Sequence, residues 1–390
     1  MSVLSSFVAA AALRGLDRAI KCGRLRLVTP DGRMHEFSGN EPGPEASMIV
    51  HDWRVAGAVM ARGDIGLGDA HMSGWWDSPD LESLLALMIR NMDGLGRMAW
   101  GSSLHRVQSV LRERLSRRNS ISGSRRNIMA HYDLGNEFYA LWLDPSMSYS
   151  SALYETPGAG LESAQRAKYR RILASLGDRR DEVLEIGCGW GGFVAEAQAG
   201  GRHVTALTIS QRQFDWARER AGSGADVRLQ DYRLSSGRFP AIVSIEMFEA
   251  VGESYWPVYF RTLRDRLTSD GMAVVQTITI SEQLFSSYRT SSDYIRHHIF
   301  PGGMLPSLTR FREEAKKAGL ACCDVYSFGQ DYAKTLRAWL ARFDASVPQI
   351  RALGYDEAFI RGWRLYLGMC AAAFAVGRTD VHQIELVPAH

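Results

Sequence analysis

The sequence is poor in cysteine and has no long apolar run. Its 390 residues include five cysteines, none paired at the spacing of a metal site. No metal is therefore assigned, and the odd count argues against a disulfide framework. Reduced thiols, as in the cytoplasm, are expected. No apolar stretch approaches the roughly 20 residues that a membrane-spanning helix needs. Residues 1–20 lack a preceding basic segment, which argues against a signal peptide. They favour a helix packed on its own domain, with a lipid-contacting helix as the alternative.

Charge of one sign is not in large excess either, since the net charge is +3 and the pI about 8.6. One basic cluster stands out: residues 111–127 carry six arginines and one acid, interrupted by serines and a glycine. We interpret this segment as a solvated linker between two domains. The alternative is attraction to an anionic bilayer, worth about 1 kcal/mol per basic residue. Nucleic acid is less favoured, because no aromatic residues interleave with the arginines.

The first hundred residues mix short strands and helices. The segment 23–37 alternates around Asp31-Gly32 and predicts a hairpin. Residues 80–92 have helical spacing, with an aspartate at the start as a cap. Three places remain open for Trp75 and Trp76: the core, an apolar groove and a lipid interface.

From residue 181 onward, strand and helix patterns alternate. This alternation predicts a doubly wound α/β sheet, mostly parallel and covered on both faces. Ligands of such sheets bind beyond the carboxyl ends of the strands. A late segment, 357–377, predicts a core helix, with the wall of an acyl channel as the alternative. The candidate strands are 182–186, 203–209, 226–230, 241–247, 271–280, 322–328 and 381–387.

A glycine turn follows the first of these strands, in "VLEIGCGWGGF" at 183–193. Gly187, Gly189 and Gly192 fit the dinucleotide pattern G-x-G-x-x-G. A dinucleotide site also needs an acid at the end of the second strand, and "ALTISQRQ" has none. Glu185 instead precedes the glycines, in the E-x-G-x-G-x-G form that is usual for S-adenosylmethionine (SAM) methyltransferases. Because SAM is cationic, the sequence favours a methyltransferase over an NAD enzyme.

The segments around this turn carry a resemblance to a known family. They are "HYDLGNEFYALWLDPSMSYSSALY", "LESAQRAKYRRI", "LTISQRQ", "LQDYR", "SIEMFEAVG", "QTITI", "IFPGGMLPS" and "FGQDYAKTLRAW". In this order they resemble the cyclopropane-fatty-acyl-phospholipid synthase family, which includes the mycolic acid cyclopropane synthases. The resemblance is close from about residue 130 to the C-terminus. It implies a lipid-binding domain at 1–105, a basic linker at 106–128 and a catalytic domain at 129–390.

The resemblance implies a class I SAM methyltransferase sheet with an antiparallel last strand, beside a smaller α+β domain. It also implies a reaction. The methyl group of SAM is transferred to a cis double bond of a phospholipid acyl chain, leaving a carbocation. Loss of a proton from the new methyl group closes a cyclopropane ring, and bicarbonate is the family's base. The implied partners are unsaturated phospholipids at the cytoplasmic face of the membrane, without nucleic acid, and a homodimer is left open.

The resemblance also assigns site residues. The residues that would form the bicarbonate site, here named the anion cradle, are Ser151, Glu249, Gln276, Ile278 and Tyr332. The residues that would bind SAM are Tyr149, Ser150, Glu185, Gly187, Gly189, Thr208, Ile209, Gln213, Asp231 and Tyr232.

Two members of the anion cradle depart from the family pattern. Ser151 stands where the archetypes have cysteine, and Gln276 stands where they have histidine. Serine and glutamine can still donate hydrogen bonds, but glutamine cannot carry a proton as histidine can. Anion binding is therefore expected to be weaker or differently arranged. Ring closure remains the first prediction, and a methyl-branched or methylene-bearing chain is the alternative.

Two hypotheses from other classes remain open. A methyltransferase that acts on amino groups of nucleic acid would show a Pro-Pro-aromatic stretch after the fourth strand, whereas this chain has "IEMFEAVG". A lipid-binding protein with an inactive catalytic domain is suggested by the two departures. The intact glycine turn and Glu249 argue against it, because an unpaired carboxylate after an apolar strand is costly unless it serves a function.

Overall fold

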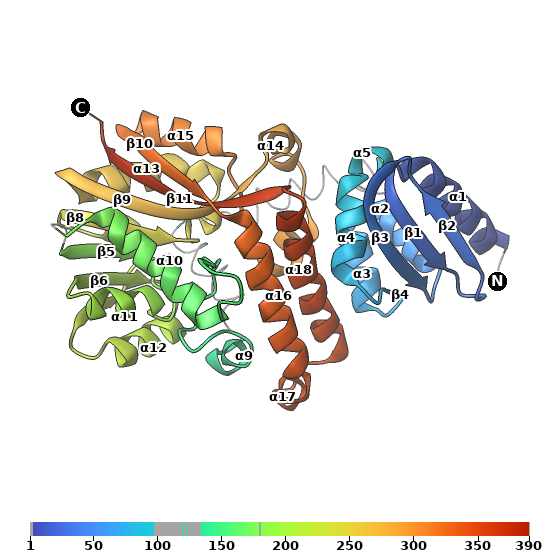
Figure 1. Ribbon diagram of the computed structural model, residues 1–390, viewed down its shortest axis with the longest axis horizontal. Helices are drawn as coiled ribbons and strands as arrows, with labels where there is room; N and C mark the ends of the chain where they lie inside the picture. The colour runs from blue at the N-terminus through green and yellow to red at the C-terminus, as the bar shows by residue number, and fades with distance from the viewer. Residues whose placement is uncertain (1–2, 97–119, 121–122, 124–133, 179–180, 390) are drawn as a thin grey trace. The chain divides into compact units, whose positions relative to one another are not determined.

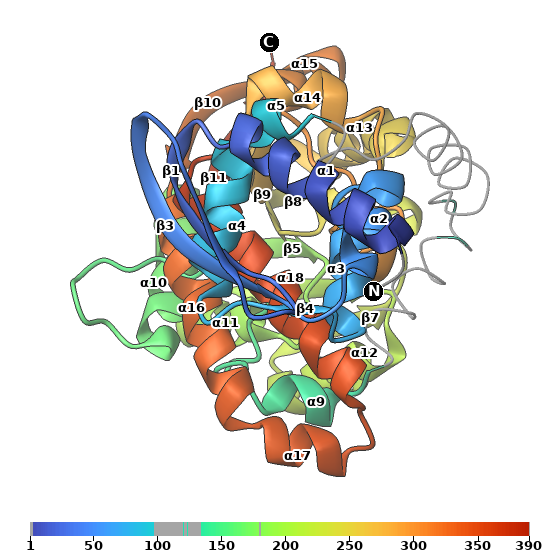
Figure 2. The same ribbon diagram turned by 90° about the vertical axis from the view of Figure 1, so that its right-hand side faces the viewer.

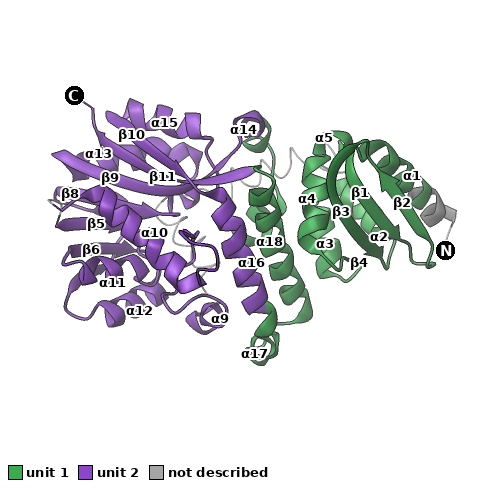
Figure 3. Ribbon diagram, in the orientation of Figure 1, with its two compact units in different colours: residues 1–115, 287–299, 344–378 green, residues 116–286, 300–343, 379–390 purple. Residues whose placement is uncertain are grey.

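The computed structural model describes residues 3–96, 120, 123, 134–178 and 181–389 (Figure 1). Apart from residues 120 and 123, the predicted linker 106–128 lies outside the described residues. The chain forms two compact units (Figure 3): unit 1 comprises 1–115, 287–299 and 344–378, and unit 2 comprises the rest. The two late segments of unit 1 were predicted within the catalytic domain, so the units do not follow a single division of the sequence. The lipid-binding role of the N-terminal domain stays a prediction.

Unit 1 contains a four-stranded sheet in the order β2-β1-β3-β4. The hairpin predicted around Asp31-Gly32 is confirmed by the antiparallel pairing of β1 with β2. Helix α4 packs on β1 and β3 (Figures 1 and 2). The elements are α1 (Val3–Ala19), β1 (Cys22–Val28), β2 (Met34–Ser38), β3 (Glu41–Val50), α2 (Arg54–Arg62), α3 (Asp64–Met72), β4 (Trp76–Asp77), α4 (Leu81–Arg90), α5 (Met92–Leu95), the π-helical turn η4 (Ile295–Ile299), α17 (Val347–Ala352) and α18 (Glu357–Ala375).

Two predictions about unit 1 are confirmed by its packing. Asp80 caps α4, because its side chain accepts a hydrogen bond from the backbone N–H of Ser83 over 2.9 Å. Helix α18 packs on α3 and α4, as expected for a core helix.

Trp76 is fully buried and donates from Nε1 to the carbonyl oxygen of Leu67, so it belongs to the core. Trp75 is half-buried, with Arg54 stacked on its ring.

Unit 2 contains a seven-stranded sheet in the order β10-β11-β9-β8-β5-β6-β7. The last strand in the chain, β11, is antiparallel to both its neighbours, and the pairs from β9 to β7 are parallel. The elements are α9 (Asn136–Ala140), α10 (Leu161–Leu176), β5 (Glu182–Ile186), α11 (Gly192–Ala199), β6 (His203–Thr208), α12 (Gln211–Ala221), β7 (Ala225–Leu229), η1 (Tyr232–Leu234), β8 (Phe239–Ile245), η2 (Phe248–Ala250), η3 (Glu253–Tyr255), α13 (Trp256–Arg266), β9 (Leu267–Ile280), α15 (Leu308–Lys317), β10 (Leu320–Ser327) and β11 (Thr379–Pro388); α14 (Glu282–Tyr288) and α16 (Gly329–Ala345) cross the boundary between the units.

Alternation of apolar side chains along the strands explains how this sheet is covered. Val183 of β5, Ala241 and Val243 of β8 and Val274 of β9 all lie in one buried cluster, together with residues of α10, α11 and α12. Helices α13 and α15 cover the other face (Figure 1). Among the described residues, no helix is long and apolar enough to cross a membrane.

Candidate functional site

The predicted site residues gather at one edge of the seven-stranded sheet, where its parallel strands end. β5 ends at the glycine turn, β6 ends at Thr208, and β8 ends just before Glu246. Strand β5 lies between β6 and β8, and the chain proceeds in opposite directions across the sheet on its two sides. Ligands of open α/β sheets bind at such a switch point. The topology therefore predicts a ligand site at the same edge that the sequence analysis indicated.

The glycine turn after β5 brings bare backbone to this edge. Gly187 and Gly189 have φ angles of +85° and +52°, a region that favours glycine. A Cβ atom on Gly187 would lie 2.7 Å from Cγ of Met247, whereas one on Gly189 would meet no heavy atom of the described part of the chain within 4 Å. The space beside Gly189 is thus open to a ligand. Cys188 is buried, and burial raises the pKa of its thiol, which suits a packing residue rather than a nucleophile.

Glu185 and Lys168 place opposite charges inside the protein beside this turn. Glu185 is 2% exposed, and its Oε2 has no hydrogen-bond partner among the residues that the structure describes. Burial raises the pKa of Glu185 to about 8, against the attraction of Lys168. Lys168, on α10, is fully buried and donates from Nζ to Oγ of Ser150 over 2.6 Å, and burial lowers its pKa to about 8. A buried carboxylate oxygen without a donor fits the cationic groups of SAM.

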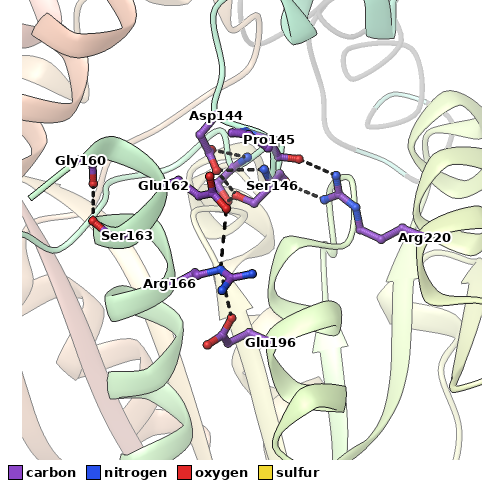
Figure 4. Close-up of polar contacts among 10 residues, drawn as sticks. Asp144, Pro145, Ser146, Gly160, Glu162, Ser163, Arg166, Glu196 and Arg220 are labelled. Atoms are coloured by element: carbon purple, nitrogen blue, oxygen red, sulfur yellow. Dashed lines mark hydrogen bonds and ion pairs between the residues drawn. The ribbon is translucent and has the colours of Figure 1, made fainter.

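The loop 141–151, between α9 and α10, carries three further predicted residues at its end. Asp144 accepts a hydrogen bond from the backbone N–H of Ser146 over 2.9 Å. Arg220, on α12, donates to the carbonyl oxygens of Ser146 and Pro145 over 2.5 and 2.8 Å (Figure 4). These contacts join the loop to the helix that follows β6. They therefore hold residues 149–151 at the edge of the sheet.

Tyr149 lies among aromatic rings. Its ring centroid is 5.5 Å from those of Tyr139 and Trp142 and 5.4 Å from that of Trp339. Trp190, from the glycine turn, packs on Tyr139 at 5.1 Å. The faces of such rings attract cations. An aromatic cluster beside the predicted SAM site suits both a sulfonium and a carbocation.

The residues predicted to contact the ribose and adenine follow β6 and β7. Thr208 donates from Oγ1 to Oε1 of Gln213 over 2.9 Å, and Ile209 beside it is half-buried. Asp231 accepts from Nε and Nη2 of Arg233 over 2.8 and 2.6 Å, so its carboxylate already has a cationic partner. Tyr232 is buried against Tyr259. The residues that follow β6 border the glycine turn, because β6 pairs with β5. The residues that follow β7 lie one strand further from that turn.

The anion cradle converges on a residue that the sequence analysis did not assign. Glu246 follows β8, and its Oε1 accepts from the backbone N–H of Ser151 and from Nε2 of Gln276, each over 2.8 Å. Its Oε2 accepts from the hydroxyl of Tyr332 over 2.5 Å. Burial raises the pKa of Glu246, although these donors and Lys168 act in the opposite direction. Three of the five predicted cradle residues therefore surround a carboxylate of the protein itself.

The other two cradle residues form a second carboxylate site. Glu249 accepts at Oε1 from the backbone N–H of Ile278 over 2.5 Å and from the hydroxyl of Thr277 over 2.9 Å. Its Oε2 is buried, and no described residue hydrogen-bonds to it. Burial, followed by the nearby charge of Glu246, raises the pKa of Glu249 to about 8. Two acidic side chains thus follow β8 and contact residues near the end of β9.

Further hydrogen bonds orient the side chains of the anion cradle. Gln383, on β11, donates from Nε2 to Oε1 of Gln276 over 3.1 Å, which turns the amide NH₂ of Gln276 toward Glu246. The Ser151 hydroxyl donates to the carbonyl oxygen of Ala152. Ser151 therefore contributes its backbone N–H to the cradle, rather than the side chain that the sequence analysis considered.

The sequence analysis missed Glu246, Lys168 and Gln383 as site residues, although signals for two of them were present. Glu246 stands directly after an apolar strand. An unpaired carboxylate after such a strand is costly, which applies to Glu246 as it does to Glu249. Lys168 falls on the apolar face of α10, with Ala164 and Ile172 four residues away on either side. Gln383 gave no signal, because its contact depends on the pairing of β11 with β9.

Comparison with known proteins identifies the family. The family model described as mycolic acid cyclopropane synthetase matches residues 119–384. Tuberculostearic acid methyltransferase UfaA1 of Mycobacterium tuberculosis is 35% identical over an alignment that covers 98% of this chain and 92% of the relative. Cyclopropane-fatty-acyl-phospholipid synthase of Escherichia coli is also 35% identical, over 84% of each protein.

Solved structures agree with this result. The cyclopropane synthase MmaA2 from Mycobacterium tuberculosis matches with 30% identity and a TM-score of 0.63, covering 67% of this chain and 97% of that one. The mycolic acid cyclopropane synthase CmaA1, complexed with SAH and CTAB, matches with 31% identity, the same coverage and the same TM-score. The predicted class I SAM methyltransferase fold is confirmed. The chain therefore belongs to the cyclopropane synthase family and is a SAM-dependent methyltransferase of the cyclopropane-fatty-acyl-phospholipid synthase type.

Proposed function

We propose that this protein transfers the methyl carbon of SAM to a cis double bond in the acyl chain of an unsaturated phospholipid. The observation that carries the proposal is the pair of carboxylates, Glu246 and Glu249, at the same sheet edge as the glycine turn. An alkene is a neutral nucleophile whose attack on SAM leaves a carbocation. Fixed negative charge and aromatic faces in a water-poor site stabilise such a cation.

The names of the relatives support a lipid substrate. The Escherichia coli relative is named for fatty-acyl phospholipids, and UfaA1 is named as a tuberculostearic acid methyltransferase. Both align with most of this chain. Within the site, the ring of Tyr149 packs on Tyr139, which in turn packs on Trp190 of the glycine turn. These rings provide apolar surface at the turn. An acyl chain is compatible with such a lining.

Ring closure is the product that we propose first, because the matching family and the Escherichia coli relative are named for it. A methyl-branched or methylene-bearing chain is the second candidate. Two observations favour it: UfaA1, which is named a methyltransferase rather than a cyclopropane synthase, aligns with nearly the whole chain, and Gln276 hydrogen-bonds to Glu246 where the family's base would bind. Both products share the methyl transfer and the cation.

We further propose that the protein works as a peripheral enzyme on the cytoplasmic face of the membrane. The support for a membrane substrate is the name of the Escherichia coli relative, which refers to phospholipids. The arginines of 111–127 would add electrostatic attraction to acidic head groups. Co-sedimentation with anionic vesicles should weaken as salt rises, and salt-independent binding would count against the role of the arginines.

The function is tested by incubating the protein with SAM and vesicles of cis-monounsaturated or fully saturated phosphatidylglycerol. Proton NMR of the recovered acyl chains separates the products. Upfield cyclopropane signals from the unsaturated lipid alone are expected. Vinyl or branched-methyl signals would establish the second candidate. Unchanged acyl chains in both vesicles, from protein that binds SAM, would refute the proposed substrate.

A further inference from the structure

Glu246 has the features of a base that is built into the chain. It stands directly after β8 with a φ angle of +47°, and only one other described non-glycine residue, Met147, has a positive φ. Such backbone conformations persist where the surrounding structure determines them, and they concentrate at functional sites. The Glu246 backbone N–H donates to the carbonyl oxygen of Gln276 over 2.8 Å. Its main chain is thus fixed to the neighbouring strand while its side chain enters the cradle.

The donors that an anion would need are already engaged. Ser151, Gln276 and Tyr332 donate to Glu246, and the backbone N–H of Ile278 donates to Glu249. A bicarbonate ion in the same place would compete for these donors. It would also bring a second negative charge beside the Glu246 carboxylate, which is unfavourable in a buried site. The residues of this cradle therefore do not fit bicarbonate.

We propose that Glu246 is the catalytic base of this enzyme and that the reaction needs no bicarbonate. This inference rests on the proposed function. A carboxylate offers the same pair of basic oxygens as bicarbonate, and here it is attached to the chain. After the S–CH₃ bond of SAM breaks and the new C–C bond forms, the adjacent chain carbon is a cation. Glu246 removes a proton from the added methyl group, and the electron pair of the broken C–H bond closes the ring. The proton passes to solvent before the next turnover.

The surroundings of Glu246 support this role. Burial raises its pKa, which makes the carboxylate a stronger base than an exposed one. Lys168, from α10, and the Tyr332 hydroxyl, from α16, favour its ionised form. The charge of Glu246 also raises the pKa of the neighbouring Glu249. Gln276 has no charge to compete for the proton, so its replacement of the family's histidine is consistent with a base located elsewhere.

The decisive comparison uses Glu246→Gly and Glu246→Gln. Glycine tolerates the positive φ angle, and it leaves the three donors facing an empty space of carboxylate size. Glutamine fills that space but cannot accept the proton. In buffer freed of carbon dioxide, we expect the wild type to keep its full rate and both variants to lose at least about 100-fold, the usual scale of a general base. Added bicarbonate should restore Glu246→Gly by at least about tenfold and leave Glu246→Gln and the wild type unchanged.

A second measurement does not depend on turnover. Bicarbonate should raise the melting temperature of Glu246→Gly but not that of the wild type, and SAM binding by calorimetry should be similar in all three proteins. A wild type that is active only with bicarbonate, or Glu246→Gln at the wild-type rate, would overturn the proposal. Bicarbonate stabilising the wild type as much as Glu246→Gly would also overturn it. If no protein acts on lipid under any condition, the proposed function fails, and the melting comparison still tests the cradle.

Discussion

Replacing Glu185 by glutamine should separate the affinity for SAM from the stability of the fold. The carboxylate is buried at the end of β5, and its Oε2 lacks a donor. A hydrogen bond to a charged group contributes about 1.5–3 kcal/mol. If the amino group of SAM supplies the missing donor, Glu185→Gln should raise the Kd for SAM about 10- to 150-fold. Removing a charge that burial disfavours should leave the melting temperature equal or higher.

Isothermal titration calorimetry measures this effect, with Glu182→Gln as the matched control. Glu182 is the first residue of the same strand and is exposed, so its variant should bind SAM like the wild type. An unchanged Kd in Glu185→Gln would refute the contact between Glu185 and the cofactor. A large fall in melting temperature would show that the carboxylate supports the fold instead.

The raised pKa of Glu185 should make SAM binding depend on pH. Burial raises the pKa of Glu185 to about 8, so the carboxyl group is increasingly protonated as the pH falls below that value. The protonated form attracts a cation less than the carboxylate does. SAM affinity of the wild type should therefore decrease as the pH falls from about 8 to about 6, while Glu185→Gln should show a flatter profile. Equal profiles for the two proteins would contradict this assignment.

Three further predictions follow from the packing. Gly189→Ala should weaken SAM binding at least about tenfold, as measured by calorimetry. The control is Gly222→Ala, because Gly222 has a similar φ of +56° and equally free surroundings among the described residues. The control should show only the backbone strain that both variants share, about 1–2 kcal/mol. Gln383→Leu should lower turnover about 2- to 10-fold at unchanged SAM affinity, since it removes one hydrogen bond that orients Gln276. Trp76→Ala should destabilise unit 1 by about 3–5 kcal/mol, and Trp75→Ala by about 1 kcal/mol or less, as followed by thermal unfolding.

The sheet could be predicted from sequence because its strands are short apolar runs bounded by turn residues. The predicted strand 182–186 matches β5, and the predicted strand at 271–280 lies within β9, which begins earlier, at Leu267. The glycine turn was also predictable, because the glycine spacing reflects backbone requirements and the preceding glutamate suits a cationic ligand. Such local signals are independent of what packs on them.

Contacts between residues far apart in the chain could not be predicted from the sequence. Unit 1 includes 287–299 and 344–378, since packing rather than chain order decides which helices join a core. Tyr294, for instance, donates from its backbone N–H to Asp64 over 3.1 Å. The position of Glu246 in the anion cradle likewise depends on three segments far apart in the chain. A sequence pattern places the carboxylate after a strand, but only the fold shows which donors meet it.

The central claim is that the methyl carbon of SAM goes to an acyl-chain alkene and that a base then removes one of its protons. Methyl-deuterated SAM with vesicles of cis-unsaturated phospholipid tests both steps in one mass spectrum of the acyl chains. We expect label in the unsaturated chain, with two of the three deuterium atoms retained after ring closure. All three retained would place the proton loss on a chain carbon. Label in the head group, or none in the acyl chain while SAM still binds, would contradict the account.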